Sequence, residues 1–165
     1  MEIILAENHG FCYGVKRAVE MANEAADSDG KSYTLGPIIH NPQVVGRLES
    51  KGVSPIQEVS DIDEGTMIIR SHGVGPAIYE EAEEKGLNIL DATCPHVKKA
   101  QQDAKSVIED EMTLVILGEK NHPEVKSINL WADNKGIIIE NEESAKNLRI
   151  VEKMGVVVQT TFSKF

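Results

Sequence analysis

The chain has 165 residues, of which 41% are apolar, so it can bury one good core or two small ones and shows no fibrous or disordered character. Its formal charge is −10, it has no Lys/Arg cluster, and only 4% of its residues are aromatic, which argues against nucleic-acid binding. No apolar run approaches the roughly 18 residues of a membrane span and no signal peptide is visible, so we expect a cytoplasmic protein.

Strand-like and helix-like segments alternate along the chain. Apolar runs predict strands at residues 2–6, 32–35, 66–69, 87–90, 112–117, 136–139 and 155–158. Amphipathic or proline-started segments predict helices at residues 15–26, 42–51, 76–85, 95–110, 123–132 and 142–148. This alternation, with strands that are nearly continuous apolar runs, predicts an α/β fold of parallel sheets with helices on both faces.

Two side chains recur together at an offset of 82 residues: Cys12 matches Cys94, and His40 matches His122. Both cysteines lie between an apolar run and the start of a predicted helix. Two residue types that keep one offset indicate two copies of one small α/β unit. We expect a first domain at residues 1–92 and a second at residues 93–165, the second lacking its closing helix. No Gly/Ser-rich linker separates them, so the two domains should touch.

The reactive side chains all follow predicted strands, within about eight residues of the strand end. In open parallel sheets this edge binds ligands, because loops converge there. Four prolines start helices just after such residues, and the N-termini of these helices favour an anion or a thiolate. The candidate site residues are Cys12, His40, His72, Cys94, His122, Glu124 and Thr160.

These residue types indicate a metal or iron–sulfur chemistry. The two cysteines, which in the cytoplasm are free thiols, metal ligands or nucleophiles more often than a disulfide, suit an iron–sulfur cluster. A third repeat of the unit would place another cysteine near position 176, past Phe165. Glu124, beside a candidate ligand, suits proton transfer. Each candidate can also have a purely structural role. The cysteines can be buried thiols, the histidines loop residues bonded to neighbours, Glu124 a carboxylate that stabilises a helix start, and Thr160 a hydroxyl that bonds to the backbone at a strand end.

Six blocks of sequence resemble the 4-hydroxy-3-methylbut-2-enyl diphosphate reductase family, in order and along the whole chain. They are GFCYGVKRA at 10–18, HNP at 40–42, SHGV at 71–74, DATCP at 91–95, HPEV at 122–125 and QTT at 159–161. The resemblance implies two of the three α/β domains of a pseudo-symmetric enzyme, with the third domain absent from this sequence. It also implies a [4Fe–4S] cluster, for which Cys12 and Cys94 match the first two of three cysteine ligands.

By the same resemblance, the reaction is the reductive dehydroxylation of 4-hydroxy-3-methylbut-2-enyl diphosphate to isopentenyl and dimethylallyl diphosphate, in the non-mevalonate isoprenoid pathway. His40, His72 and His122 then bind the diphosphate, Glu124 donates protons, and Thr160 orients the substrate hydroxyl or relays the proton. The implied partners are an electron donor of the ferredoxin or flavodoxin type and the C-terminal domain of the same enzyme. We expect this chain alone to hold no intact cluster and to be inactive.

Two other functions fit the residues. A zinc-dependent hydrolase would use His40, His72 and His122 as ligands and Glu124 as general base. A phosphate-binding module without catalysis would use the helix N-termini, although neither a Gly-x-Gly-x-x-Gly fingerprint nor a P-loop is present.

Overall fold

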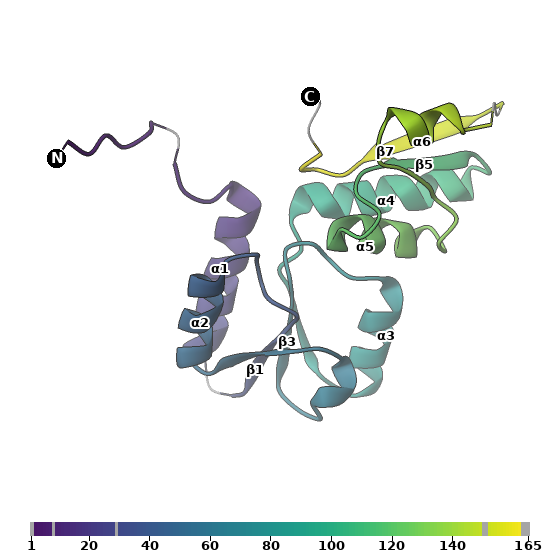
Figure 1. The fold of residues 1–165 in the computed structure, drawn as a ribbon. Helices are drawn as coiled ribbons and strands as arrows, with labels where there is room; N and C mark the ends of the chain where they lie inside the picture. Colours follow the sequence, from purple (N-terminus) through teal and green to yellow (C-terminus); the bar gives the residue numbers. More distant parts are fainter. Residues whose placement is uncertain (1, 8, 29, 150–151, 163–165) are drawn as a thin grey trace.

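The computed structural model describes residues 2–7, 9–28, 30–149 and 152–162 and contains two parallel sheets (Figure 1). The first sheet has the strand order β2-β1-β3-β4 and the second has the order β6-β5-β7. The strands are β1 (Ser32–Leu35), β2 (Val53–Ile56), β3 (Thr66–Ile69), β4 (Asn88–Asp91), β5 (Thr113–Leu117), β6 (Ile137–Ile139) and β7 (Met154–Val158). The helices are α1 (Tyr13–Ala26), α2 (Pro42–Ser50), α3 (Pro76–Glu84), α4 (Pro95–Glu109), α5 (Pro123–Trp131) and α6 (Glu142–Lys146), with a 3₁₀ turn η1 (Val59–Asp61).

Helices cover both faces of the first sheet, as predicted. The strand residues alternate between the two faces, so Ile68 packs with α1 and α2 while Met67 and Ile69 pack with α3 and η1. All three side chains are fully buried. The predicted α/β class with parallel sheets is therefore confirmed.

The second sheet has its core on one face, where α4 and α5 pack against β5 and β7. Val157 of β7 is buried in this core, whereas its neighbours Val156 and Val158 are 52% and 46% exposed. Because successive strand residues point to opposite faces, the exposed valines lie on the face away from α4 and α5. The short helix α6, whose residues are all partly or fully exposed, lies beside β6.

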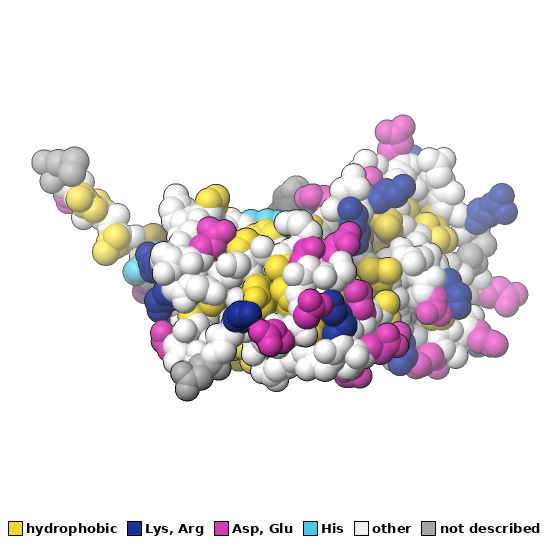
Figure 2. Space-filling view, turned by 90° about the horizontal axis from the view of Figure 1, so that it is seen from below, with side chains coloured by type: hydrophobic (Ala, Val, Ile, Leu, Met, Phe, Trp, Pro, Cys, Tyr) yellow, Lys and Arg dark blue, Asp and Glu magenta, His cyan; other side chains and the backbone are white. Residues whose placement is uncertain are grey.

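The predicted strand at residues 2–6 is wrong. Residues 2–7 form no regular secondary structure, and Ile3, Ile4 and Leu5 are at least 74% exposed. Figure 2 shows this segment standing clear of the body of the molecule with its apolar side chains in view. A strand needs a neighbouring edge to satisfy its backbone groups, and no strand among the described residues pairs with this segment.

The two units meet through contacts between the loop after β3 and helix α5, and the chain passes from one sheet to the other just after β4. Asp91 ends β4 in the first sheet, and α4, which starts at Pro95, packs on the second. The carbonyl of Val74 accepts hydrogen bonds from Trp131 Nε1 at 2.9 Å and from Ser127 Oγ at 3.3 Å. The domain boundary at residues 92/93 lies within this passage and stays a prediction.

The surface agrees with the charge pattern of the sequence. On the face seen in Figure 2, Lys and Arg side chains are interspersed with acidic ones and form no continuous basic area. Within the described part of the chain, no helix combines the length and the apolar character needed to cross a bilayer.

Candidate active site

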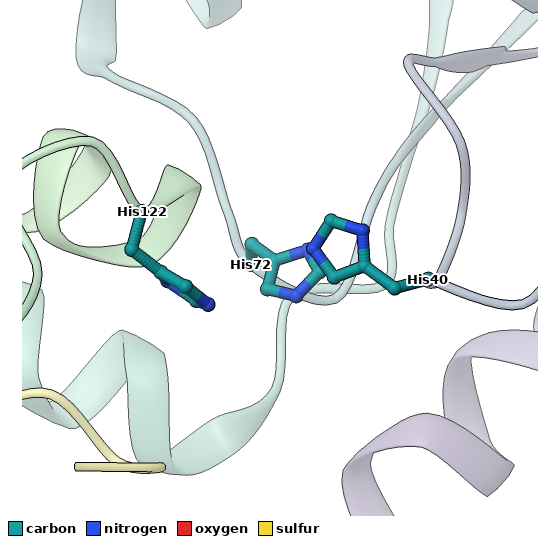
Figure 3. A group of neighbouring side chains, drawn as sticks. All are labelled: His40, His72 and His122. Carbon is teal, nitrogen blue, oxygen red and sulfur yellow. The ribbon is translucent and has the colours of Figure 1, made fainter.

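Three histidines from three different loops come together at the carboxyl edges of the two sheets. His40 follows β1, His72 follows β3, and His122 immediately precedes α5 in the second unit. Their ring centroids are 4.6 Å apart for His40–His72, 5.5 Å for His72–His122 and 6.3 Å for His40–His122. Figure 3 shows the three rings pointing toward one another. The sequence prediction that these loops share one space thus agrees with the geometry.

The histidine cluster, meaning His40, His72 and His122, offers one ring nitrogen from each residue, all within 4.8 Å of one another. The Nδ1 atom of His122 accepts a 3.2 Å hydrogen bond from the backbone N–H of Glu124. In the neutral ring this leaves the proton on Nε2, which becomes a donor. The His72 Nδ1 atom is buried without a hydrogen-bond partner among the described residues. The cluster therefore has nitrogen atoms available for a ligand.

His72 is neutral at pH 7. Burial, followed by the nearby His40, Arg70 and His122 side chains, lowers its pKa from 6.5 to about 4. Arg70 is itself half-buried, and burial lowers the pKa of its guanidinium. Its Nε atom has no partner among the residues described. Arg70 was not predicted as a site residue; its only signal in the sequence is that it directly follows a strand and precedes the Ser71-His72 pair.

Glu124 and Thr160 form a second part of the site. Glu124 lies in the first turn of α5 and is 1% exposed. Its carboxylate accepts two hydrogen bonds from Thr160, one from the backbone N–H at 2.6 Å and one from the hydroxyl at 2.9 Å. Thr160 follows β7, so two strand ends of the second sheet, β5 and β7, supply this pair. A buried carboxylate with a hydroxyl attached is a proton-transfer arrangement.

Both cysteines are free thiols and occupy the same structural position. Cys12 is the N-cap residue of α1 and Cys94 is the N-cap residue of α4, and neither sulfur caps its helix by a hydrogen bond. Cys12 is exposed and Cys94 is half-buried. The start of α1 lies against Cys94, because a Cβ atom at Gly14 would be only 2.5 Å from the Cys94 sulfur. The structure therefore brings the helix that begins at Cys12 next to the second thiol.

A backbone hydrogen bond joins the loop of Cys94 to the loop of His72. The N–H of Cys94 donates a 2.9 Å hydrogen bond to the carbonyl of Ser71, the residue before His72. His9 and His96 lie outside the histidine cluster and are exposed at the surface, and the Nδ1 atom of His9 hydrogen-bonds to the Ala6 carbonyl. The sequence reasoning also missed Arg17, whose guanidinium reaches the backbone of residues 91–93. No local signal marks that contact, since it joins segments more than 70 residues apart.

Comparisons with known proteins agree with this geometry. The LytB protein family model matches residues 3–165. A curated relative from Geotalea uraniireducens, named 4-hydroxy-3-methylbut-2-enyl diphosphate reductase, is 51% identical over 99% of this chain and 58% of its own length. The chain thus spans little more than half of this curated relative.

Solved structures give the same result. A structure described as (E)-4-hydroxy-3-methyl-but-2-enyl diphosphate reductase, the terminal enzyme of the non-mevalonate pathway, matches 98% of this chain and 59% of its own, with 45% identity and a TM-score of 0.83. The E-1-hydroxy-2-methyl-but-2-enyl-4-diphosphate reductase of Plasmodium falciparum matches 96% of this chain and 51% of its own, with 33% identity and a TM-score of 0.90. The family resemblance of the sequence motifs is confirmed, and the chain belongs to the LytB protein family.

Proposed function

We propose that this chain forms two of the three units of a 4-hydroxy-3-methylbut-2-enyl diphosphate reductase. The reaction breaks the allylic C–O bond, and two electrons and two protons yield water and either isopentenyl or dimethylallyl diphosphate. The proposal is carried by the histidine cluster, whose member His122 accepts the backbone N–H of Glu124, and by the bond of the buried Glu124 carboxylate to Thr160. The chain's relatives bear this enzyme's name.

The histidine cluster would bind the diphosphate. A buried neutral ring such as His72 donates one hydrogen bond, and an anion beside it raises its pKa and favours uptake of a second proton. The N-terminus of α5, at His122, adds the positive end of its dipole. The site thus gains positive charge only when the anion is bound, which favours diphosphate over a neutral alcohol.

Glu124 would deliver protons at the reacting end of the substrate. Its carboxylate is buried, so water does not compete for the proton, and its only hydrogen bonds among the described residues come from Thr160. Once Glu124 is protonated, the Thr160 hydroxyl can turn, accept the proton of Glu124 and donate its own proton to the oxygen of the substrate hydroxyl. A proton would then move from Glu124 through Thr160 to the leaving oxygen.

Cys12 and Cys94 would hold two of the irons of a [4Fe–4S] cluster. Both are free thiols at helix N-termini, and the start of α1 lies against Cys94. The donor set fits the cluster in type, while the chain's two cysteines leave the third ligand to another segment. When bound, the cluster supplies electrons beside the hydroxyl that leaves.

The partners follow from this chemistry. The two electrons require a low-potential donor of the ferredoxin or flavodoxin type, and the third cysteine and further substrate contacts require a third domain. Free thiols in place of a disulfide are typical of the cytoplasm, which we propose as the location. We expect the chain alone, reconstituted anaerobically with iron and sulfide, to hold fewer than three irons and to show no turnover.

A chimera tests the proposal. The chain would be joined to the remaining C-terminal segment of the Geotalea uraniireducens relative, reconstituted anaerobically and assayed with reduced methyl viologen. We expect turnover, and we expect the Glu124→Gln variant to lose at least about 100-fold in kcat. The matched control is Glu109→Gln, an exposed carboxylate on α4. Full activity of the Glu124→Gln chimera would contradict the assigned role.

The zinc-dependent hydrolase is not favoured, although the histidine cluster has the spacing of a metal site. The family match covers both cysteines as well as the histidines, and the named relatives are reductases. A hydrolase would retain its activity in the Cys12→Ser and Cys94→Ser variants, whereas the proposed reductase loses it.

A further inference from the structure

The two cysteines lie on different segments, and contacts outside their own backbones hold these segments together. Residues 2–7 before Cys12 form no strand, so no sheet anchors the start of α1. Residues 91–94, here called the Cys94 loop, run from the last residue of β4 to the N-cap of α4. The relative position of the thiols therefore depends on how α1 is attached to the Cys94 loop.

Arg17 makes this attachment. One turn into α1 after Cys12, its guanidinium donates from Nη1 to the Thr93 carbonyl at 3.3 Å and from Nη2 to the Asp91 carbonyl at 3.4 Å. The side chain is half-buried between the two segments. A planar guanidinium with two parallel donors fixes direction as well as distance, which a single ammonium group does not.

Asp91 holds the other side of the contact in place. Its Oδ1 atom accepts the backbone N–H of Thr93 at 2.9 Å, which closes the Cys94 loop on itself. Its Oδ2 atom accepts from the Tyr79 hydroxyl at 3.0 Å and from Lys98 Nζ at 2.7 Å. The carboxylate thus joins the Cys94 loop to both α3 and α4, the helices on either side of it.

The protonation state of Asp91 suits this role. Burial disfavours its ionised form, but the hydrogen bonds from Lys98 and Thr93 outweigh burial and keep the pKa of Asp91 below its ordinary value. The carboxylate remains charged at neutral pH and keeps all three donors.

Gly14 completes the contact. A methyl group at this position would lie 2.5 Å from the Cys94 sulfur and 3.0 Å from its Cβ atom. Glycine therefore lets the first turn of α1 rest directly on Cys94, and Arg17 fixes the helix in that position from one turn further along.

We infer that Arg17 and Asp91 are positioning residues that set the distance between the thiols of Cys12 and Cys94. Arg17 fastens the helix of the first thiol to the loop of the second, and Asp91 keeps that loop in one conformation. The inference rests on the proposed function in one respect, namely that both thiols bind the same cluster. That Arg17 and Asp91 position the two thiols can be tested on this chain without the cluster.

Cross-linking of the two thiols by dibromobimane, which becomes strongly fluorescent only when both of its arms have reacted, tests the inference on the reduced chain. We expect Arg17→Met to lower the cross-linking rate about fivefold, because two hydrogen bonds are lost, and Arg17→Lys to recover part of it. Asp91→Asn should also lower the rate. Lys16→Met is the matched control: Lys16 is the adjacent basic residue on α1, and its side chain points to solvent. It should leave the rate unchanged.

Two further measurements separate positioning from other effects. Monobromobimane, which needs one thiol only, should react with each cysteine at the wild-type rate in the Arg17 variants. The cross-linking rate of the urea-unfolded chain is the rate expected when nothing positions the thiols. A variant that reacts at this rate in both assays has failed to fold. Equal cross-linking by Arg17→Met and Lys16→Met, or a wild-type rate no higher than that of the unfolded chain, would overturn the inference. If cross-linking follows the prediction but the chimera holds no cluster, the positioning stands and the proposed function fails.

Discussion

At the scale of single residues, His72 links the site to pH. Its folded-state pKa of about 4 lies below the ordinary value of 6.5, so the unfolded chain takes up a proton first as the pH falls. The contribution of His72 to the free energy of unfolding is therefore fully present above about pH 6.5 and is lost progressively as the pH falls to about 4. Since the ring is partly exposed, solvent screening reduces the effect to about 2 kcal/mol.

We therefore expect the free energy of unfolding to fall by about 2 kcal/mol more in the wild type than in His72→Asn between about pH 7 and pH 4.5. Urea titrations at each pH measure this. His96→Asn, which changes an exposed histidine, should retain the wild-type slope. An identical slope in His72→Asn would show that the ring titrates normally.

The bond between Thr160 and Glu124 makes a second prediction at this scale. Thr160→Val removes the 2.9 Å hydroxyl donor from a carboxylate that is 1% exposed, so the free energy of unfolding should fall by about 1–3 kcal/mol. Thr161→Val is the control, because among the described residues its hydroxyl bonds only to the Gln159 amide and to no buried carboxylate. Chemical denaturation measures the free energy of unfolding of both variants. An equal loss in the two would show that the bond from Thr160 to Glu124 does not stabilise the fold more than an ordinary surface hydrogen bond.

At the scale of helices and strands, most elements were predicted from the sequence because particular residues mark where they start. Pro42, Pro76, Pro95 and Pro123 each occupy the first position of a helix, as expected from the fixed φ of proline. Strand β2 was missed because Pro55 interrupts a short segment of mixed polarity. The strand lies at the edge of its sheet, where a proline is tolerated.

The same scale explains which site residues could be predicted. His40, His72, His122, Glu124 and Thr160 follow strands of parallel sheets, so topology alone brings them toward shared edges. The roles of Arg17 and Asp91 depend on contacts between α1, α3 and α4, which no local pattern encodes. The error at residues 2–6 has the converse cause, because an apolar run predicts a strand whether or not an edge is present to pair with it.

Gly73 allows a prediction on the packing between elements. It has φ +71°, and a Cβ atom there would lie 2.5 Å from Gln101 Nε2 and 3.0 Å from Ser127 Oγ. Gly86 has φ +69° with no atom within 4 Å of its added Cβ. Both alanine variants carry the same backbone strain, so the difference between them isolates packing.

We expect Gly73→Ala to lower the free energy of unfolding by about 1–3 kcal/mol more than Gly86→Ala, because Gln101 and Ser127 are buried and cannot move aside freely. Thermal and urea unfolding of the two variants measure the difference. Equal losses would mean that the loop after β3 does not pack firmly against α4 and α5.

At the scale of the whole molecule, both units contribute side chains to one candidate site. The hydrogen bonds from Trp131 and Ser127 to the Val74 carbonyl hold the loop of His72 against the second unit. The histidine cluster draws two members from the first unit and one from the second, and the two free thiols likewise start one helix on each sheet. The residues that repeat in the sequence thus take matching places in the two units: both cysteines precede a helix, and both histidines belong to the histidine cluster.

The most direct measurement of the central claim is Mössbauer spectroscopy of the ⁵⁷Fe-reconstituted chimera, in the wild type and in the Cys12→Ser and Cys94→Ser variants. Our account predicts a [4Fe–4S] spectrum in the wild type that is lost in both variants. Lys16→Met, which changes a neighbouring exposed residue, should keep the wild-type spectrum. An unchanged cluster spectrum in either cysteine variant would contradict the account.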